Sequence, residues 1–171
     1  FFGFATVCMA APPSSVQLEP NVVSIGAMYN GADVIATGEI PNGAQVLVQV
    51  TGEREDTVLS EKGKVFGFLW MNTGQVTLRN APTVYMLYLP EAYSSEVSGG
   101  VRWRELGVGF EALRKQVEIT SSNEKPDSDF DEFVKLKQKE GLYAVHKDAL
   151  QYGKEQGPIR TFSCKICMPP R

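Results

Sequence analysis

Two cysteines near the end of the chain have a spacing that could support chemistry. Cys164 and Cys167 form a C-x-x-C motif, which in redox proteins places the first thiol at a helix N-terminus, where its pKa is lowered. Residues 159–168 instead alternate as a strand does, and a strand sends side chains three residues apart to opposite faces. We interpret both as structural, and keep a thiol redox or metal-binding protein using this pair as the alternative.

The other reactive side chains do not form a recognisable catalytic set. The chain has one histidine, His146, so neither a multi-histidine metal site nor a catalytic triad with a choice of base can be proposed. Acids gather at residues 53–56 and 127–132, which we interpret as a solvated loop and the first turn of a helix. We expect no catalytic residue and no cofactor, and hence a protein that is not an enzyme. A hydrolase would need a cleft that gives two carboxylates unlike environments.

Composition restricts the possible partners. With 17 Lys and Arg against 20 Asp and Glu, the formal net charge is −3, and no basic block marks a nucleic-acid surface. We expect no nucleic-acid partner. The length suits one domain with its own core.

The first residues are typical of a secretion signal. Residues 1–11 are apolar, end in Ala10-Ala11 and pass into prolines and serines, which resembles the back half of a signal peptide. A buried first strand or a lipid-modified Cys8 are the alternatives. No other segment approaches the ~20 apolar residues of a membrane helix. We expect a periplasmic or extracytoplasmic domain over residues 16–171.

Short strands separated by turn residues dominate the first half. Asn30-Gly31 between residues 22–28 and 33–40 predicts a β-hairpin, and Asn42-Gly43 before residues 45–52 repeats the signal. Strands at this spacing are typical of an immunoglobulin-like β-sandwich.

The most apolar run of the mature chain is VFGFLWMN, residues 65–72. Its length excludes a membrane span. Because both faces would be apolar, we predict a strand covered on both sides, with a helical cover. Residues 82–90 form a second such run. The aromatics Trp70, Tyr85 and Tyr88 are candidates for an interaction surface, although aromatics at strand spacing more often lie in a core.

Helical patterns follow the strands. Residues 105–115 have apolar side chains at helical spacing, and Ser128 with Asp131 resembles a capping box that opens a helix ending at Gly141. The predicted fold is therefore mainly β, an immunoglobulin-like β-sandwich with a helical insertion at about residues 101–141, α+β overall.

Several motifs together resemble a known family. The run Lys62 to Asn72, then residues 76–78 and 81–85, resembles the central signature of uncharacterised bacterial proteins described as putative transmembrane proteins, first grouped from alphaproteobacteria. The resemblance implies a cleaved signal, an extracytoplasmic β-rich domain and a C-terminal membrane anchor. This chain stops at Arg171, so a final strand and the anchor would lie outside it. The family has no established activity or catalytic residues to carry over.

These observations lead to one functional hypothesis. We expect a non-catalytic extracytoplasmic module that binds or scaffolds a protein partner in an envelope complex. In the full-length protein it would be tethered to the membrane by the anchor that this chain lacks.

Overall fold

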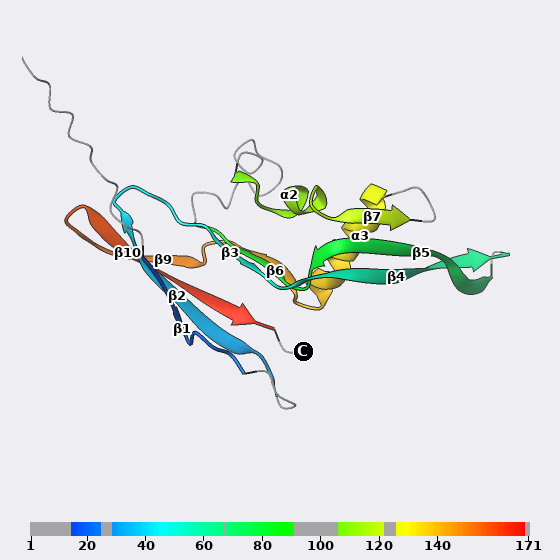
Figure 1. Cartoon of the computed structure of the whole chain (residues 1–171), viewed down its shortest axis with the longest axis horizontal. Helices are drawn as coiled ribbons and strands as arrows, with labels where there is room; N and C mark the ends of the chain where they lie inside the picture. The colour runs from blue at the N-terminus through cyan, green and yellow to red at the C-terminus, as the bar shows by residue number, and fades with distance from the viewer. Residues whose placement is uncertain (1–14, 25–28, 67, 91–105, 122–125, 170–171) are drawn as a thin grey trace, which may run out of the picture. The chain divides into compact units, whose positions relative to one another are not determined.

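The computed structural model describes residues 15–24, 29–66, 68–90, 106–121 and 126–169. The chain divides into two compact units, and each is described by itself. Unit 1 takes residues 1–46 and 150–171, and unit 2 takes the contiguous residues 47–149. The structure is mainly β with several sheets (Figure 1), as the sequence predicts. The expectation of a single domain over residues 16–171 stays a prediction.

Unit 1 contains one antiparallel sheet of four strands in the order β1-β2-β10-β9. The strands are β1 (Val16–Glu19), β2 (Ala32–Pro41), β9 (Leu150–Gln156) and β10 (Ile159–Met168). Strand β10 has the bounds that its alternation predicts. Buried side chains occupy alternate positions of β2 and β10, which places them on one face: Val34, Ala36, Ile40, Phe162, Cys164 and Ile166.

The two predicted Asn-Gly turns have different outcomes. At Asn42-Gly43 a turn does form, since the amide of Ala44 donates to the carbonyl of Pro41 and Gly43 has a φ of 81°. It does not close a hairpin, because the next strand belongs to another sheet. The predicted hairpin at Asn30-Gly31 is wrong in its described part. Residues 22–24 are not a strand, and β2 pairs instead with β1; residues 25–28 lie outside the described residues.

The segment that leaves β2 is held by the β9–β10 hairpin. The backbone amide of Asn42 donates to the carbonyl of Pro158 at 2.9 Å, and its side-chain Nδ2 donates to the carbonyl of Gly157 at 2.7 Å. Further along, Arg160 donates to the carbonyl of Ala44 and stacks over the ring of Tyr152. These contacts bind two parts of the chain that are more than a hundred residues apart.

The described part of unit 2 has two three-stranded sheets and two helices (Figure 1). One sheet has the order β3-β6-β8, with β3 (Val48–Thr51), β6 (Tyr85–Tyr88) and β8 (Tyr143–His146). The other has the order β4-β5-β7, with β4 (Arg54–Val65), β5 (Leu69–Pro82) and β7 (Glu118–Ser121). The helices are α2 (Phe110–Arg114) and α3 (Pro126–Lys139). Both fall within the predicted insertion at 101–141, which also contains β7.

Strand β6 is covered on both faces. All four of its side chains are buried, as the apolar run at 82–90 predicts. It pairs antiparallel with β3 and parallel with β8. A parallel pair requires a long crossover connection, and here that connection carries α2, β7 and α3.

Helix α3 begins and ends for local reasons. It ends as predicted at Gly141, whose φ of 74° suits glycine. The amide of Gly141 donates to the carbonyl of Gln138, and the amide of Leu142 donates to the carbonyl of Lys137. These two hydrogen bonds form a Schellman motif. The predicted start at Ser128 is wrong. The helix begins at Pro126, because proline at the first position lacks only an amide that would have no intrahelical partner.

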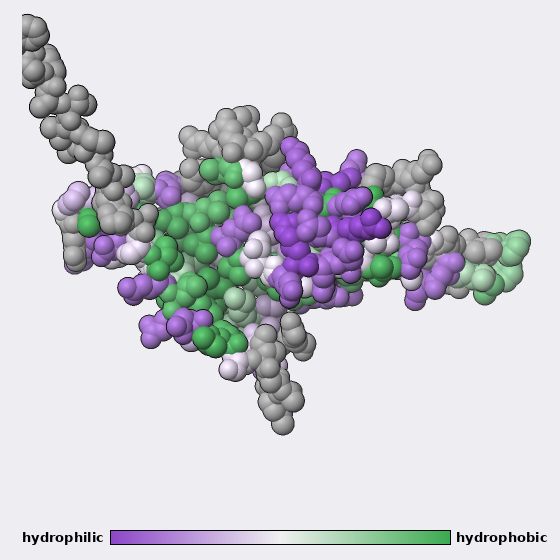
Figure 2. Space-filling model, viewed as in Figure 1, coloured by the Kyte–Doolittle hydropathy of each residue, from purple (hydrophilic) through white to green (hydrophobic). Residues whose placement is uncertain are grey.

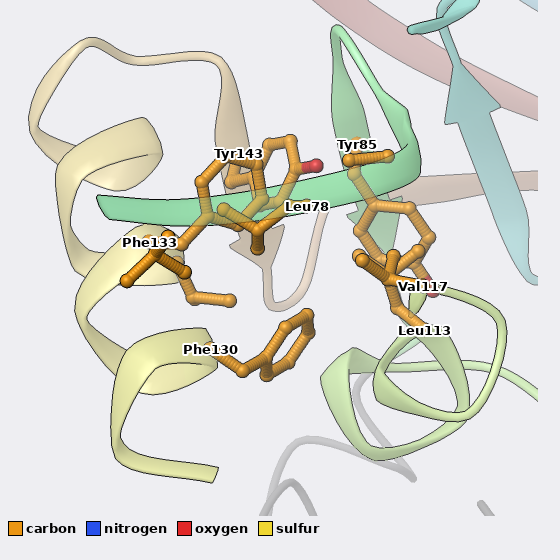
Figure 3. Close-up of a cluster of buried hydrophobic side chains, with 10 residues drawn as sticks. Leu78, Tyr85, Leu113, Val117, Phe130, Phe133 and Tyr143 are labelled. Carbon is orange, nitrogen blue, oxygen red and sulfur yellow. The ribbon is translucent and has the colours of Figure 1, made fainter. Parts of the chain in front are cut away.

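The core of unit 2 lies where α3 meets the strands (Figure 3). Phe130 and Phe133 on α3 point toward Leu78 on β5 and Tyr143 on β8. The ring of Tyr143 contacts Phe133 edge-on at 5.6 Å between centroids, and its hydroxyl donates to the carbonyl of Pro82 at 2.7 Å. One aromatic side chain thus joins β8, α3 and the end of β5.

We predict that Gly38→Ala destabilises unit 1. Gly38 lies opposite Phe162 on β10, and an added Cβ would lie 2.6 Å from that ring and would also meet the carbonyl of Ser15. The free energy of unfolding should fall by about 1–3 kcal/mol, measured by urea unfolding. Gln17→Ala, at an exposed position of β1, should change it by less than about 0.5 kcal/mol. Equal stability of the two variants would contradict the close packing at Gly38.

We predict that Tyr143→Phe lowers the stability of unit 2 by about 1–3 kcal/mol, because the buried carbonyl of Pro82 loses its donor. The hydroxyl of Tyr152 accepts a hydrogen bond from the amide of Val46 at a partly buried position, so Tyr152→Phe should lower stability less.

Burial raises the pKa of Tyr143 above its ordinary value of 10.0. The folded state therefore favours the protonated phenol, and its contribution is lost as the pH rises above about 10. The stability of Tyr143→Phe should fall less steeply there; parallel curves would refute this role.

Candidate functional site

The apolar run at 65–72 forms the tip of the β4–β5 hairpin. Val65 pairs with Leu69, and Phe66, which follows Val65, adopts a left-handed φ of 55°. The prediction of a strand covered on both sides is therefore wrong for this run. Strand β7 pairs with β5 only at Val76–Arg79, so among the described strands nothing extends the sheet alongside the tip.

The tip exposes large apolar side chains. The exposed fractions are 86% for Phe66, 78% for Phe68, 47% for Leu69 and 48% for Met71. We call these four residues the hairpin tip; Figure 2 shows green atoms on the right of the view, where the β4–β5 hairpin ends in Figure 1. Burying apolar surface is favourable by about 25 cal/mol per Å², so a tip of this kind gains from any apolar cover. Exposed apolar patches are typical of the surfaces through which proteins contact partners, ligands or membranes.

Basic residues lie behind the tip. From Lys62 to Pro90 the sequence contains Lys62, Lys64 and Arg79 and no Asp or Glu. Lys62 is exposed and pairs with Asn72, and Lys64 pairs with Trp70. The nearest acid in the ribbon is Glu61, opposite Gly74. The exposed apolar end of the hairpin is therefore followed by positive charge.

The predicted aromatic surface of Trp70, Tyr85 and Tyr88 does not form as a unit. Tyr85 and Tyr88 are only 3% and 2% exposed, so they belong to the core rather than to a surface. The hydroxyl of Tyr85 accepts a hydrogen bond from the amide of Gly109 at 2.8 Å, and burial raises its pKa. Tyr88 stacks on His146 with centroids 4.6 Å apart. Trp70 lies in β5 beside the tip, and its side chain lies outside the described residues.

Cys164 and Cys167 lie on opposite faces of β10, as the sequence predicts. Cys164 is buried and Cys167 is exposed, and no disulfide joins them. Burial raises the pKa of Cys164 to about 11. The pKa of Cys167 is also raised, first by desolvation and then by its hydrogen bond to Asp33. A reactive thiol needs a lowered pKa, so the environment of both thiols opposes thiolate formation.

Asp33 connects Cys167 to a salt bridge on the same face of the sheet. Its Oδ2 lies 2.8 Å from Nζ of Lys165, and this contact lowers the pKa of Asp33. Asp33 therefore carries its charge directly opposite Cys167 in the strand register. Within the described residues, no group of three or more His, Cys, Asp or Glu side chains is placed to hold a metal ion.

The acidic clusters make structural contacts. Asp127 pairs with Arg114 at 2.9 Å across α3 and α2, and Asp56 accepts a hydrogen bond from the amide of Asn80 at 3.1 Å. Arg54 donates to Gln116 at 2.6 Å. These contacts tie β4, β5 and the helical region together.

The sequence did contain a signal for the exposed tip. A glycine in a three-residue interval between strand-like runs is typical of a hairpin loop, and Phe66-Gly67-Phe68 fits it. The high hydrophobicity of the flanking residues favoured the interpretation as a buried strand.

A family model described as "Putative transmembrane protein (Alph_Pro_TM)" matches residues 15–171. The chain belongs to this family. No curated protein and no solved structure matched it. Neither described helix has the length and apolarity required to cross a bilayer. The family description supports an association with the membrane.

We predict that Cys167 reacts with a thiol reagent in the folded protein, whereas Cys164 reacts only on unfolding. In a Cys8→Ser background, labelling should be slow near neutral pH and should still increase above pH 9, because the thiolate is the reacting form and the pKa of Cys167 is raised. Asp33→Asn should accelerate labelling at pH 8 several-fold by removing the adjacent negative charge, and Glu39→Gln, six residues along β2, should not. Fast labelling of both cysteines at pH 7 would contradict this and favour the redox alternative.

Proposed function

We propose that this chain is a non-catalytic binding or scaffolding module of a membrane-associated complex in the bacterial envelope. The module acts on the extracytoplasmic side, is tethered to the membrane in the full-length protein, and binds a protein partner. Family membership supports the association with a membrane. The compartment, the tether and the partner are parts of the proposal.

The observation that carries the proposal is the hairpin tip. Its four apolar side chains are exposed at the end of a two-stranded ribbon, beyond the residues that pair with β7. A fold that places Phe66 and Phe68 in solvent gains stability when another surface covers them. The tip therefore supports a role in contact with another component of the envelope.

The chemistry of the reactive side chains also favours binding over the alternative of a thiol redox or metal protein. The pKa values of Cys164 and Cys167 are raised, which is the opposite of what a redox pair requires. The strand keeps their side chains on opposite faces, which does not suit a bridge between the two sulfurs.

The proposal is tested by cross-linking the tagged full-length protein in intact cells and purifying it from solubilised membranes. We expect a protein partner to copurify, and its recovery to fall several-fold in the double variant Phe66→Asn/Phe68→Ser. Asn tolerates the left-handed φ at position 66, so the loop should keep its conformation.

Leu136→Ser is the matched control. It removes a large apolar side chain, 40% exposed, from α3 and should leave recovery of the partner unchanged. Full-length protein recovered alone would count against a binding or scaffolding role.

A further inference from the structure

The proposed function leaves open what covers the hairpin tip. The candidates are a protein surface, a second copy of the chain and the lipid bilayer itself. These three partners differ in the apolar area they need to bind, in the charge they attract and in the depth to which a side chain enters them. Each requirement can be compared with the area, the charge and the length of the hairpin tip.

The area of the tip is small for a protein interface. Phe66 and Phe68 are almost fully exposed, and Leu69 and Met71 are about half exposed. Together their side chains present on the order of 500 Å² of apolar surface. A stable protein interface buries about 800 Å² on each partner. Insertion into a membrane interface has no such threshold, because binding grows with the apolar area that enters it. The limited area therefore favours lipid.

The charge behind the tip favours an anionic lipid surface. Lys62 and Lys64 are the charged residues nearest the tip, whereas Arg79 lies further along β5, opposite Glu118 of β7. Basic residues beside an inserted apolar element attract anionic headgroups. The positive charge therefore lies on the side of the tip where headgroups would be.

The spacing along the ribbon also fits a bilayer. A strand rises by about 3.3 Å per residue, so Lys64 and Lys62 stand roughly 7 and 13 Å behind Phe66. Interfacial elements bury their apolar side chains about 5–10 Å below the headgroup boundary. At that depth the strand positions of both lysines lie at the level of the headgroups, and the long, exposed side chain of Lys62 can reach them.

We infer that the hairpin tip inserts into the interfacial layer of an anionic lipid bilayer, with Lys62 and Lys64 at the headgroups. This inference rests on the proposed membrane-associated function and names the surface that the tip contacts. Insertion of the tip brings the remaining surfaces of the module to a protein partner in the same membrane, so a tip variant that no longer enters the bilayer also loses that partner.

The test is flotation of the 171-residue chain with vesicles of phosphatidylcholine alone and of phosphatidylcholine with phosphatidylglycerol. We expect binding to the anionic vesicles, with a partition coefficient that falls at least tenfold in Phe66→Asn/Phe68→Ser. Lys62→Gln/Lys64→Gln should weaken binding to the anionic vesicles and reduce its dependence on salt. Leu136→Ser should bind as the wild type does.

Two controls make the result specific to the tip. All variants keep residues 1–11, so any lipid binding by that apolar run is common to them. Circular dichroism and thermal unfolding establish that each variant is folded. In a Cys8→Ser/Cys167→Ser background, a polarity-sensitive dye on Phe68→Cys should shift to the blue only with anionic vesicles.

Three results would overturn the inference. One is equal flotation of the wild type and the tip variant, and another is no flotation at all. The third is a dimer in solution that depends on Phe66 and Phe68, which would assign the tip to a second copy. If vesicles do not bind while the tip variant still loses its cross-linked partner, the tip is a protein contact, and the proposed function stands without the lipid inference.

Discussion

The position of β6 is the constraint on which unit 2 depends. This strand is buried on both faces and pairs with β3 in one direction and with β8 in the other. The parallel pair requires a crossover, and the chain uses it to build α2, β7 and α3. Strand β7 extends the β4–β5 sheet, and α3 supplies the aromatic core. The base of the β4–β5 hairpin is therefore paired with β7, a strand that lies in the crossover between β6 and β8.

Sequence patterns predicted the ends of those helices and strands that are fixed by neighbouring residues in the chain. Strand β10 has the predicted bounds because its alternation continues without interruption, and α3 ends at Gly141 because glycine adopts the left-handed φ that terminates it. Strand pairing was not predictable in this way. The Asn-Gly sequences mark places where the chain can turn, but β2 takes its partners from residues 16–19 and 159–168, which no local signal identifies.

The candidate site shows the same division. The opposite exposure of Cys164 and Cys167 followed from the period of a strand, so it was predictable. The exposure of Phe66 and Phe68 was not, because hydrophobicity gives the preference of a side chain but does not say whether the fold supplies a cover. Tyr85 and Tyr88 illustrate the converse, since equally aromatic residues in β6 are fully covered by the core.

Unit 1 is discontinuous, since it is made from residues on both sides of unit 2. Strand β10, which lies between β2 and β9, is the last strand of the described chain to be synthesised. Unit 2 is contiguous and can complete its contacts while the chain is still growing. Until β10 arrives, β2 keeps one edge open, so this strand is exposed to mispairing during synthesis.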